Sequence, residues 1–253
     1  MRVRAWWLAV GRRWWFLAGA GCVGLGVWLA TPEWLEDLRE RAFAPRLSRY
    51  PIRGLDVSHH QGDIDWPRVK ESGLTFAFIK ATEGADFRDT RFVENWARAN
   101  AAGLVTGAYH FFTFCASGES QAKHFLGVVA QLEHALPLGV DVEFTGNCKS
   151  WESILGIQSE LRTFVERVEA ARGEKLLLYT VFDQFEELVP KELYAHTLWI
   201  RSSWGEPKLS LPWLFWQFSD SGEVPGIRGP VDLDVFSGDW VTWSELVGPA
   251  SSE

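Results

Sequence analysis

From residue 54 to residue 201 the chain alternates short apolar runs with segments that have the composition and end signals of helices. The long segment 154–172, for example, is followed by Gly173, a usual residue at the C-terminus of a helix. Strands and helices in turn, with short connections, predict an α/β fold with a parallel sheet. The predicted strands are 54–58, 76–80, 106–112, 138–143, 176–179 and 197–201, and the predicted helices are 67–72, 92–102, 117–129, 154–172 and 182–188.

Beyond Arg201 the helical pattern stops. Two more strands are predicted, over 215–218 and 231–236, with a turn-rich segment, 219–229, between them. About five βα units completed by bare strands predict a modified, irregular β/α barrel, because a regular eight-fold barrel needs about 250 residues for itself. The whole chain has 253 residues, which suits one sizeable domain.

The first thirty residues have the pattern of an export or membrane segment. Arg12 and Arg13 precede seventeen residues without a charge, 14–30, which is the short end of a membrane-spanning length. The arginines favour a cytoplasmic N-terminus, with everything after Ala30 outside the membrane. We therefore expect an N-terminal membrane helix.

Cleavage of this segment remains an open alternative. Trp28 and Leu29 crowd the position where a small-residue cleavage site would stand, which favours a retained signal anchor over a cleaved signal peptide. A lipoprotein modified at Cys22 and a buried soluble helix are weaker interpretations.

The charge balance argues against a nucleic-acid partner. The net charge is −8, and four of the 25 basic residues fall in the first thirteen positions. The remainder is strongly acidic, whereas a nucleic-acid-binding domain presents a basic face. Three cysteines are too few for a four-cysteine zinc site or a disulfide-dense miniprotein.

The segment 138–144, which reads LGVDVEF, carries the clearest chemical signal. Side chains alternate along a strand, so Val140 and Val142 are expected to face the helices while Asp141 and Glu143 point into the barrel near its C-terminal mouth. Of two neighbouring carboxyl groups, one tends to keep its proton and can serve as a general acid beside an ionised partner. A solvated edge strand is the alternative, but the flanking apolar residues favour a central strand.

Two further strand ends carry acids. Asp56 ends the first predicted strand, and Asp232 and Asp234 alternate in the last one. Each acid alone could be a helix cap or a turn residue. Because catalytic groups of a barrel come from the C-terminal ends of different strands, the set predicts an acidic cleft.

Other chemistries find little support. His59 and His60 are adjacent in a segment expected to be extended, so their rings would point to opposite sides and would not easily share a metal ion. We expect His110 to be hydrogen-bonded near the barrel interior rather than to bind a metal. No nucleophile elbow, P-loop or dinucleotide fingerprint occurs, and no cofactor is expected.

Seven segments in order resemble glycoside hydrolase family 25, the lysozyme-type N-acetylmuramidases. They are Gly54–Trp66, Phe76–Gly84, Gly107–Phe112, Leu138–Phe144, Leu198–Ile200, Trp216–Ile227 and Val231–Phe236. That family has a modified β/α barrel with fewer helices than a regular one. The resemblance implies hydrolysis of the β-1,4 bond between N-acetylmuramic acid and N-acetylglucosamine in peptidoglycan.

The resemblance also implies residue roles. Glu143 would be the general acid, Asp141 would stabilise or orient the 2-acetamido group of the sugar, and Asp56 and Asp232 would complete the acidic cluster. Asp234 often corresponds to an Asn in the family and is interpreted as structural. The positions that match the substrate groove of the family are Tyr109, Tyr179, Trp216 and Gln217.

The stereochemical route is open at this point. The spacing of Asp141 and Glu143 does not by itself choose retention or inversion, and we favour retention by attack of the substrate's own acetamido oxygen. Two other functions remain as alternatives: a wall-binding barrel without turnover, and a metal-dependent amidase or deacetylase.

Cys115 and Cys148 follow consecutive predicted strands. Consecutive βα units are usually neighbours, and the compartment outside the membrane is oxidising, so we predict a disulfide between them. Together these inferences divide the chain into a basic stub and signal anchor (1–30), a stalk (31–53), a catalytic domain (54–245) and a tail (246–253). We expect a single-pass protein of the cytoplasmic (inner) membrane with its catalytic domain outside, or a secreted protein if the first segment is cleaved.

Overall fold

The computed structural model describes residues 45, 48–133, 136–149 and 153–248. The predicted signal anchor (1–30) and most of the predicted stalk lie outside these residues. Among the helices that are described, none is both long and apolar enough to cross a membrane.

Eight strands close into a barrel. Around the ring the order is β1-β9-β8-β7-β6-β5-β4-β2, and β1 pairs with β2 to close it. All neighbours are parallel except β9, which is antiparallel to both β8 and β1. The strands are β1 (Arg53–Val57), β2 (Phe76–Glu83), β4 (Val105–Phe111), β5 (Gly139–Asp141), β6 (Leu177–Val181), β7 (Thr197–Arg201), β8 (Trp213–Gly222) and β9 (Val231–Phe236), and a two-residue strand, β3 (Phe87–Arg88), extends the edge of β2. The predicted irregular α/β barrel is confirmed.

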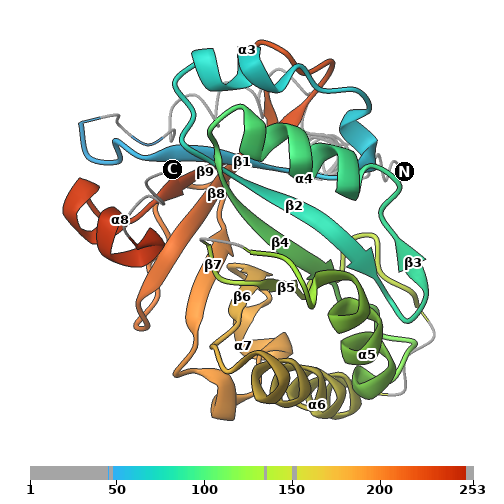
Figure 1. Ribbon diagram of the computed structural model, residues 1–253. Coiled ribbons are helices and arrows are strands. Elements are labelled where there is room, and N and C mark those ends of the chain that lie inside the picture. The colour runs from blue at the N-terminus through green and yellow to red at the C-terminus, as the bar shows by residue number, and fades with distance from the viewer. Residues whose placement is uncertain (1–44, 46–47, 134–135, 150–152, 249–253) are drawn as a thin grey trace, which may run out of the picture. The chain divides into compact units, whose positions relative to one another are not determined.

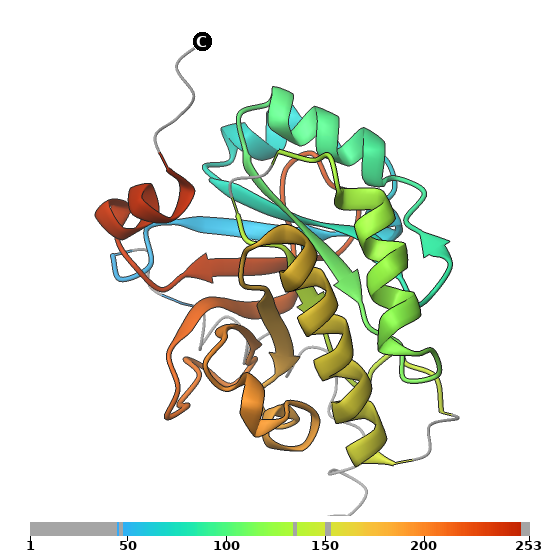
Figure 2. The ribbon, with the colours of Figure 1, turned by 60° about the horizontal axis from the view of Figure 1, so that its bottom comes forward.

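The helices follow the strands as the alternation predicted. They are η1 (His59–Gln61), α3 (Trp66–Glu71), α4 (Phe92–Ala101), α5 (Gly118–Val129), α6 (Ile154–Arg172), α7 (Phe185–Leu188), η2 (Lys191–Leu193) and α8 (Trp240–Val247). Figures 1 and 2 show α5 and α6 side by side on the outside of the barrel.

The prediction that helices stop after Arg201 is wrong, because α8 follows β9. Asp239 caps this helix: its Oδ1 accepts the backbone N–H groups of Val241 and Thr242. Trp243 is the buried residue of α8, and it packs on Phe76, the first residue of β2, with ring centroids 5.5 Å apart. The helix therefore covers the barrel at the amino-terminal end of β2 (Figure 1).

Because side chains alternate along each strand, apolar residues pack both on the outer face of the barrel and in its interior. Val140 and Val142 face outward and pack in one cluster with helix residues such as Phe164 and Val165, as predicted. The inward-facing residues form a second, largely aromatic cluster in which the rings of Phe78 and Trp199 stack with centroids 4.4 Å apart.

The filled interior depends on small residues as well as large ones. A Cβ at Gly107 would lie 2.6 Å from the Phe78 ring, which is closer than real Cβ contacts come, so the aromatic packing needs a glycine there. The interior is thus packed below the level at which β1, β5 and β9 present their acids.

Candidate active site

A cavity of about 370 Å³ opens above the aromatic interior, at the carboxyl ends of the parallel strands. This is the place where barrel enzymes carry their catalytic groups. All four predicted catalytic acids line it, together with three of the four predicted groove residues: Asp56, Asp141, Glu143, Asp232, Tyr109, Tyr179 and Gln217.

Asp141 is the last residue of β5, and Glu143 lies two residues further along. The strand is shorter than the predicted 138–143, yet the alternation carries on far enough to send both carboxyl groups into the cavity. Oδ1 of Asp141 and Oε2 of Glu143 are buried and have no hydrogen-bond partner among the described residues. The protein itself thus leaves one carboxyl oxygen of each of these two cavity-lining residues without a partner.

The surroundings favour a shared proton on this pair. Burial raises the pKa of Asp141 well above its ordinary value, and the charge of Glu143 raises it further. Burial also raises the pKa of Glu143 to about 7, although the positive charges of Arg201 and Lys80 oppose the rise. Near neutral pH the pair thus holds a proton that Glu143 can donate, which is what general acid catalysis requires.

Asp56 and Asp232 stand opposite each other on β1 and β9. Gln217 Nε2 donates to Asp56 Oδ2 at 2.6 Å, and the Tyr179 hydroxyl donates to Gln217 Oε1 at 2.9 Å. Burial, with the charge of Asp56, raises the pKa of Asp232 to about 9. Gln217 therefore acts on the acidic cluster directly, and Tyr179 acts on it through Gln217.

Trp216 does not line the cavity. It precedes Gln217 on β8, so its side chain points to the other face of the strand, where it is buried against Tyr50 and Phe218. Its ring meets the Tyr50 ring edge-on, at 5.7 Å between centroids, and its Nε1 donates to the Ser202 carbonyl. The resemblance suggested a groove position for both Trp216 and Gln217, but strand alternation separates them.

Sequence reasoning missed Lys80, which is buried in the cavity wall. Its Nζ lies 2.6 Å from Glu83 Oε2 and 4.6 Å from the centroid of the Phe111 ring. Lys80 ends the predicted strand 76–80 on the same face as Phe76 and Phe78. A charged residue at the inward position of a strand end was the signal that could have found it.

The histidine predictions need correction. His59 and His60 lie in the 3-10 helix η1 rather than in an extended segment, so their rings lie side by side with centroids 4.1 Å apart. His59 Nδ1 is 2.8 Å from Asp89 Oδ2. Within 48–133, 136–149 and 153–248, no group of three or more His, Cys, Asp or Glu side chains has the geometry to hold a metal ion.

His110 is fully buried and hydrogen-bonded, as predicted, but on the outer side of β4. Its Nδ1 bonds to Thr82 Oγ1 at 2.7 Å and its Nε2 to Gln121 Oε1 at 3.1 Å. The ring stacks on Phe164 of α6. The predicted location near the barrel interior is therefore wrong.

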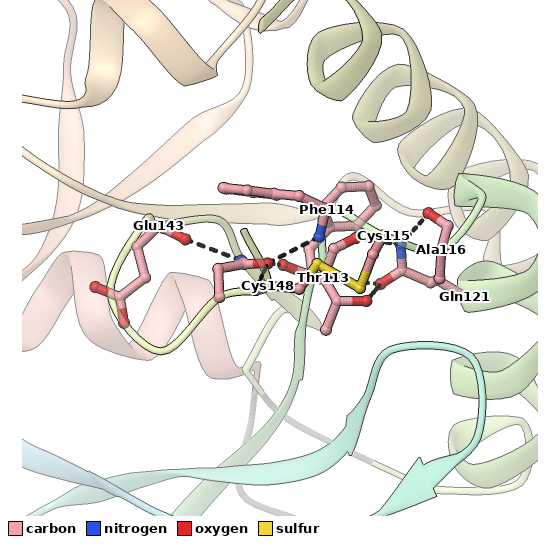
Figure 3. The surroundings of a disulfide bond; sticks show 9 residues. Thr113, Phe114, Cys115, Ala116, Gln121, Glu143 and Cys148 are labelled. Carbon is pink, nitrogen blue, oxygen red and sulfur yellow. Dashed lines mark hydrogen bonds between the residues drawn. A yellow bond between two sulfur atoms is a disulfide. The ribbon is translucent and has the colours of Figure 1, made fainter. Parts of the chain in front are cut away.

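The predicted disulfide between Cys115 and Cys148 is confirmed, with a Cα–Cα distance of 6.2 Å. It joins the loops that follow β4 and β5. Asn147 reinforces the junction by donating to the Phe112 carbonyl and accepting the Phe114 N–H, and it donates to the Glu143 carbonyl within its own loop. Figure 3 shows the Glu143 carboxyl group pointing away from the disulfide. The disulfide thus holds the loop that carries Glu143 without touching its carboxyl group.

Comparisons with known proteins agree with this geometry. Residues 55–227 match the family model "Glycosyl hydrolases family 25". The chain is 35% identical to the uncharacterised protein YegX of Escherichia coli K12, over 78% of this chain and 74% of YegX. It is 33% identical to Lysozyme M1 of Streptomyces globisporus, over 74% of this chain and 68% of that protein.

Among solved structures, the fold resembles a family 25 glycosyl hydrolase from Bacillus anthracis. The TM-score is 0.73 and the sequence identity is 37%, with 81% of this chain and 97% of that chain covered.

Proposed function

The chain belongs to glycosyl hydrolase family 25, and from this membership we propose that it is a lysozyme that hydrolyses the β-1,4 bond between N-acetylmuramic acid and N-acetylglucosamine in peptidoglycan. One observation carries the proposal. Asp141 and Glu143 stand together in the cavity, each with a buried oxygen that has no partner among the described residues, and burial raises the pKa of Glu143 to about 7.

In the proposed first step Glu143 gives its proton to the oxygen of the scissile bond. The acetamido oxygen of the N-acetylmuramic acid attacks the anomeric carbon as the bond to the leaving sugar breaks. Asp141 accepts a hydrogen bond from the acetamido N–H and stabilises the positive charge that develops there. No protein nucleophile is needed in this route.

In the second step water opens the cyclic intermediate. Glu143, now a carboxylate, takes a proton from the water while the oxygen of the water bonds to the anomeric carbon. The anomeric configuration is retained because two inversions occur at the same carbon. The support for this route is the placement of Asp141 beside Glu143 on one strand end.

We also propose that residues 1–30 hold the enzyme at the cytoplasmic membrane with the barrel outside. The arginines at 12 and 13 and the uncharged run 14–30 support this location, and a disulfide suits an oxidising compartment. Fractionation of cells that express the full chain tests it: the protein should sediment with membranes and be accessible to protease from outside.

Incubation of the protein with purified peptidoglycan tests the activity itself. The proposal predicts soluble fragments and new reducing ends, in equal amounts with and without a metal chelator. Sedimentation with the wall without any release would indicate a binding barrel. New free amino groups that vanish with the chelator would indicate a metal-dependent amidase.

A further inference from the structure

Three aromatic rings lead outward from the cavity on the side of β1 and β2. His60 lines the cavity itself. Its ring lies beside the His59 ring, with centroids 4.1 Å apart, and the His59 ring lies 5.5 Å from that of Phe87. Together His60, His59 and Phe87 form a continuous strip, which we call the rim strip, from the cavity wall to β3.

Strand register explains why Phe87 lies at the mouth of the barrel. β3 pairs with the carboxyl end of β2, and Phe87 stands opposite Glu83 in that pair (Figure 1). Side chains that are directly opposite each other project from the same face of a sheet, and Glu83 lines the cavity. The Phe87 side chain therefore continues the cavity wall, and the residue is 36% exposed.

A buried carboxyl group holds the middle ring of the strip. Asp89 is only 3% exposed. Its Oδ2 accepts the backbone N–H of His59 at 2.9 Å and lies 2.8 Å from Nδ1 of the same residue, while its Oδ1 accepts the Arg91 N–H. The His59 side chain is thus held in one place although 31% of it is exposed. A ring that is already ordered loses little conformational entropy when a ligand packs against it.

The chemistry of the strip suits an uncharged sugar. Burial, and then the positive charges of His59 and Lys80, lower the pKa of His60, so its ring is neutral at neutral pH. The faces of aromatic rings offer apolar surface to the C–H groups of a pyranose. The nitrogens of a neutral imidazole can donate a hydrogen bond to a sugar hydroxyl group and accept one from it.

We propose that the rim strip is a binding subsite for the glycan strand, occupied by sugar residues that lie beyond those held at Asp141 and Glu143. The inference rests on the function proposed above and extends it. The cavity, at about 370 Å³, is near the lower limit for ligand pockets, whereas the proposed substrate is a polymer. Part of the strand must therefore bind outside the cavity, and the rim strip is an ordered aromatic surface that continues it.

Binding to the full chain carrying Glu143→Gln tests the proposal without hydrolysis of the ligand. The probe is a stem-free strand of eight alternating N-acetylglucosamine and N-acetylmuramic acid residues, with Kd measured by calorimetry. Addition of Phe87→Ala should weaken binding roughly three- to tenfold, as expected for the loss of one aromatic contact. Phe87→Tyr keeps the ring and should restore the affinity.

Trp240→Ala is the matched control. Trp240 is 53% exposed, but it lies on α8, at the other end of the barrel from the cavity. Its replacement also removes an exposed aromatic ring, yet the Kd for the eight-sugar strand should not change. A general loss of affinity with any exposed ring would therefore be recognised.

A second readout needs no substitution in the strip. In NMR spectra of the Glu143→Gln chain, the ring signals of His59 and His60 should shift when the eight-sugar strand is added. Those of His196, whose buried ring bonds to Glu169, should stay in place and serve as the internal reference.

An unchanged Kd in Phe87→Ala, or histidine signals that do not move while the strand binds, would overturn the inference. So would an effect seen only with peptide-bearing fragments, because the occupant would then be the peptide stem. Absence of any binding of the strand would overturn it too. If wild type releases no fragments from peptidoglycan, the proposed function fails, while strand binding and the histidine shifts still decide whether the rim strip holds sugar.

Discussion

Gln217 Nε2 lies 2.6 Å from Asp56 Oδ2, so an amide on β8 holds a carboxyl group on β1 across 161 positions of sequence. The amide is oriented in turn, because its Oε1 accepts the Tyr179 hydroxyl at 2.9 Å. A neutral donor at this point fixes Asp56 without adding a positive charge to the cluster. The whole relay is buried, which makes each of its hydrogen bonds costly to lose.

Gln217→Glu should be strongly damaging for this reason. The substitution keeps the size but replaces the donor by a further acid against Asp56, and a buried polar group left unpaired costs about 1–3 kcal/mol. We expect kcat/KM on peptidoglycan to fall roughly tenfold or more. Tyr179→Phe, which removes only the upstream hydrogen bond, is the matched control and should cost less. Equal activity of Gln217→Glu and wild type would contradict the relay.

The roles of Glu143 and Asp141 can be separated with an activated substrate. An aryl glycoside whose leaving group is a weakly basic phenolate needs little help from a general acid. Glu143→Gln should therefore lose about 10²–10⁴-fold on peptidoglycan and far less on the aryl glycoside. Asp141→Asn should lose similar factors on both substrates, because the acetamido group must be oriented in either case. Equal losses of Glu143→Gln on both would refute the general-acid role.

Activity should decline as the pH rises through about 7, where Glu143 loses the proton that it must donate. The positive charge of Arg201 lowers the pKa of Glu143. Asp220, which forms an ion pair with Arg201, raises the pKa of Glu143. Arg201→Gln should thus move the alkaline limb of the kcat/KM profile to higher pH, and Asp220→Asn should move it to lower pH. Arg201→Lys, which keeps the charge, is the control. Shifts in the same direction for Arg201→Gln and Asp220→Asn would contradict this account.

Removal of the disulfide should destabilise the fold more than it alters catalysis. Cys115 and Cys148 are 33 positions apart, and closing a loop of that length is worth about 3–4 kcal/mol in the chain-entropy account. The double variant with serine at both positions should therefore show a clearly lower Tm. The hydrogen bonds of Asn147 with Phe112 and Phe114 still join the two loops, so kcat at a temperature well below the Tm should change little. An unchanged Tm would show that the disulfide carries no stability.

The acidic cluster could be predicted because side chains alternate between the two faces of any strand whose position in the sequence is predicted correctly. The apolar run around Asp141 and Glu143 predicted a central strand, and a central parallel strand sends alternate side chains toward the barrel mouth. The same rule applied to Lys80 would have placed it in the cavity wall, and applied to Trp216 it would have placed that residue outside.

Other features depend on local structure that strand alternation does not report. Ser58 and Gln61 form a capping box that folds the intervening histidines into η1, which brings their rings together. Asp239 caps the start of α8, in a part of the chain where no helix was predicted. The acceptor of the Trp199 N–H, Asp234, is set by the register between distant strands. The predicted anchor over 1–30 lies outside the described residues and remains a prediction.

The most direct test of the central claim is the identity of the sugar at each new reducing end. Peptidoglycan digested by wild type would be reduced with borohydride, and the fragments identified by mass, beside a digest with Glu143→Gln. We predict reduced muramic acid at the new ends with wild type and its absence with the Gln variant. Reduced glucosamine at the new ends, or cleavage that survives Glu143→Gln, would contradict the account.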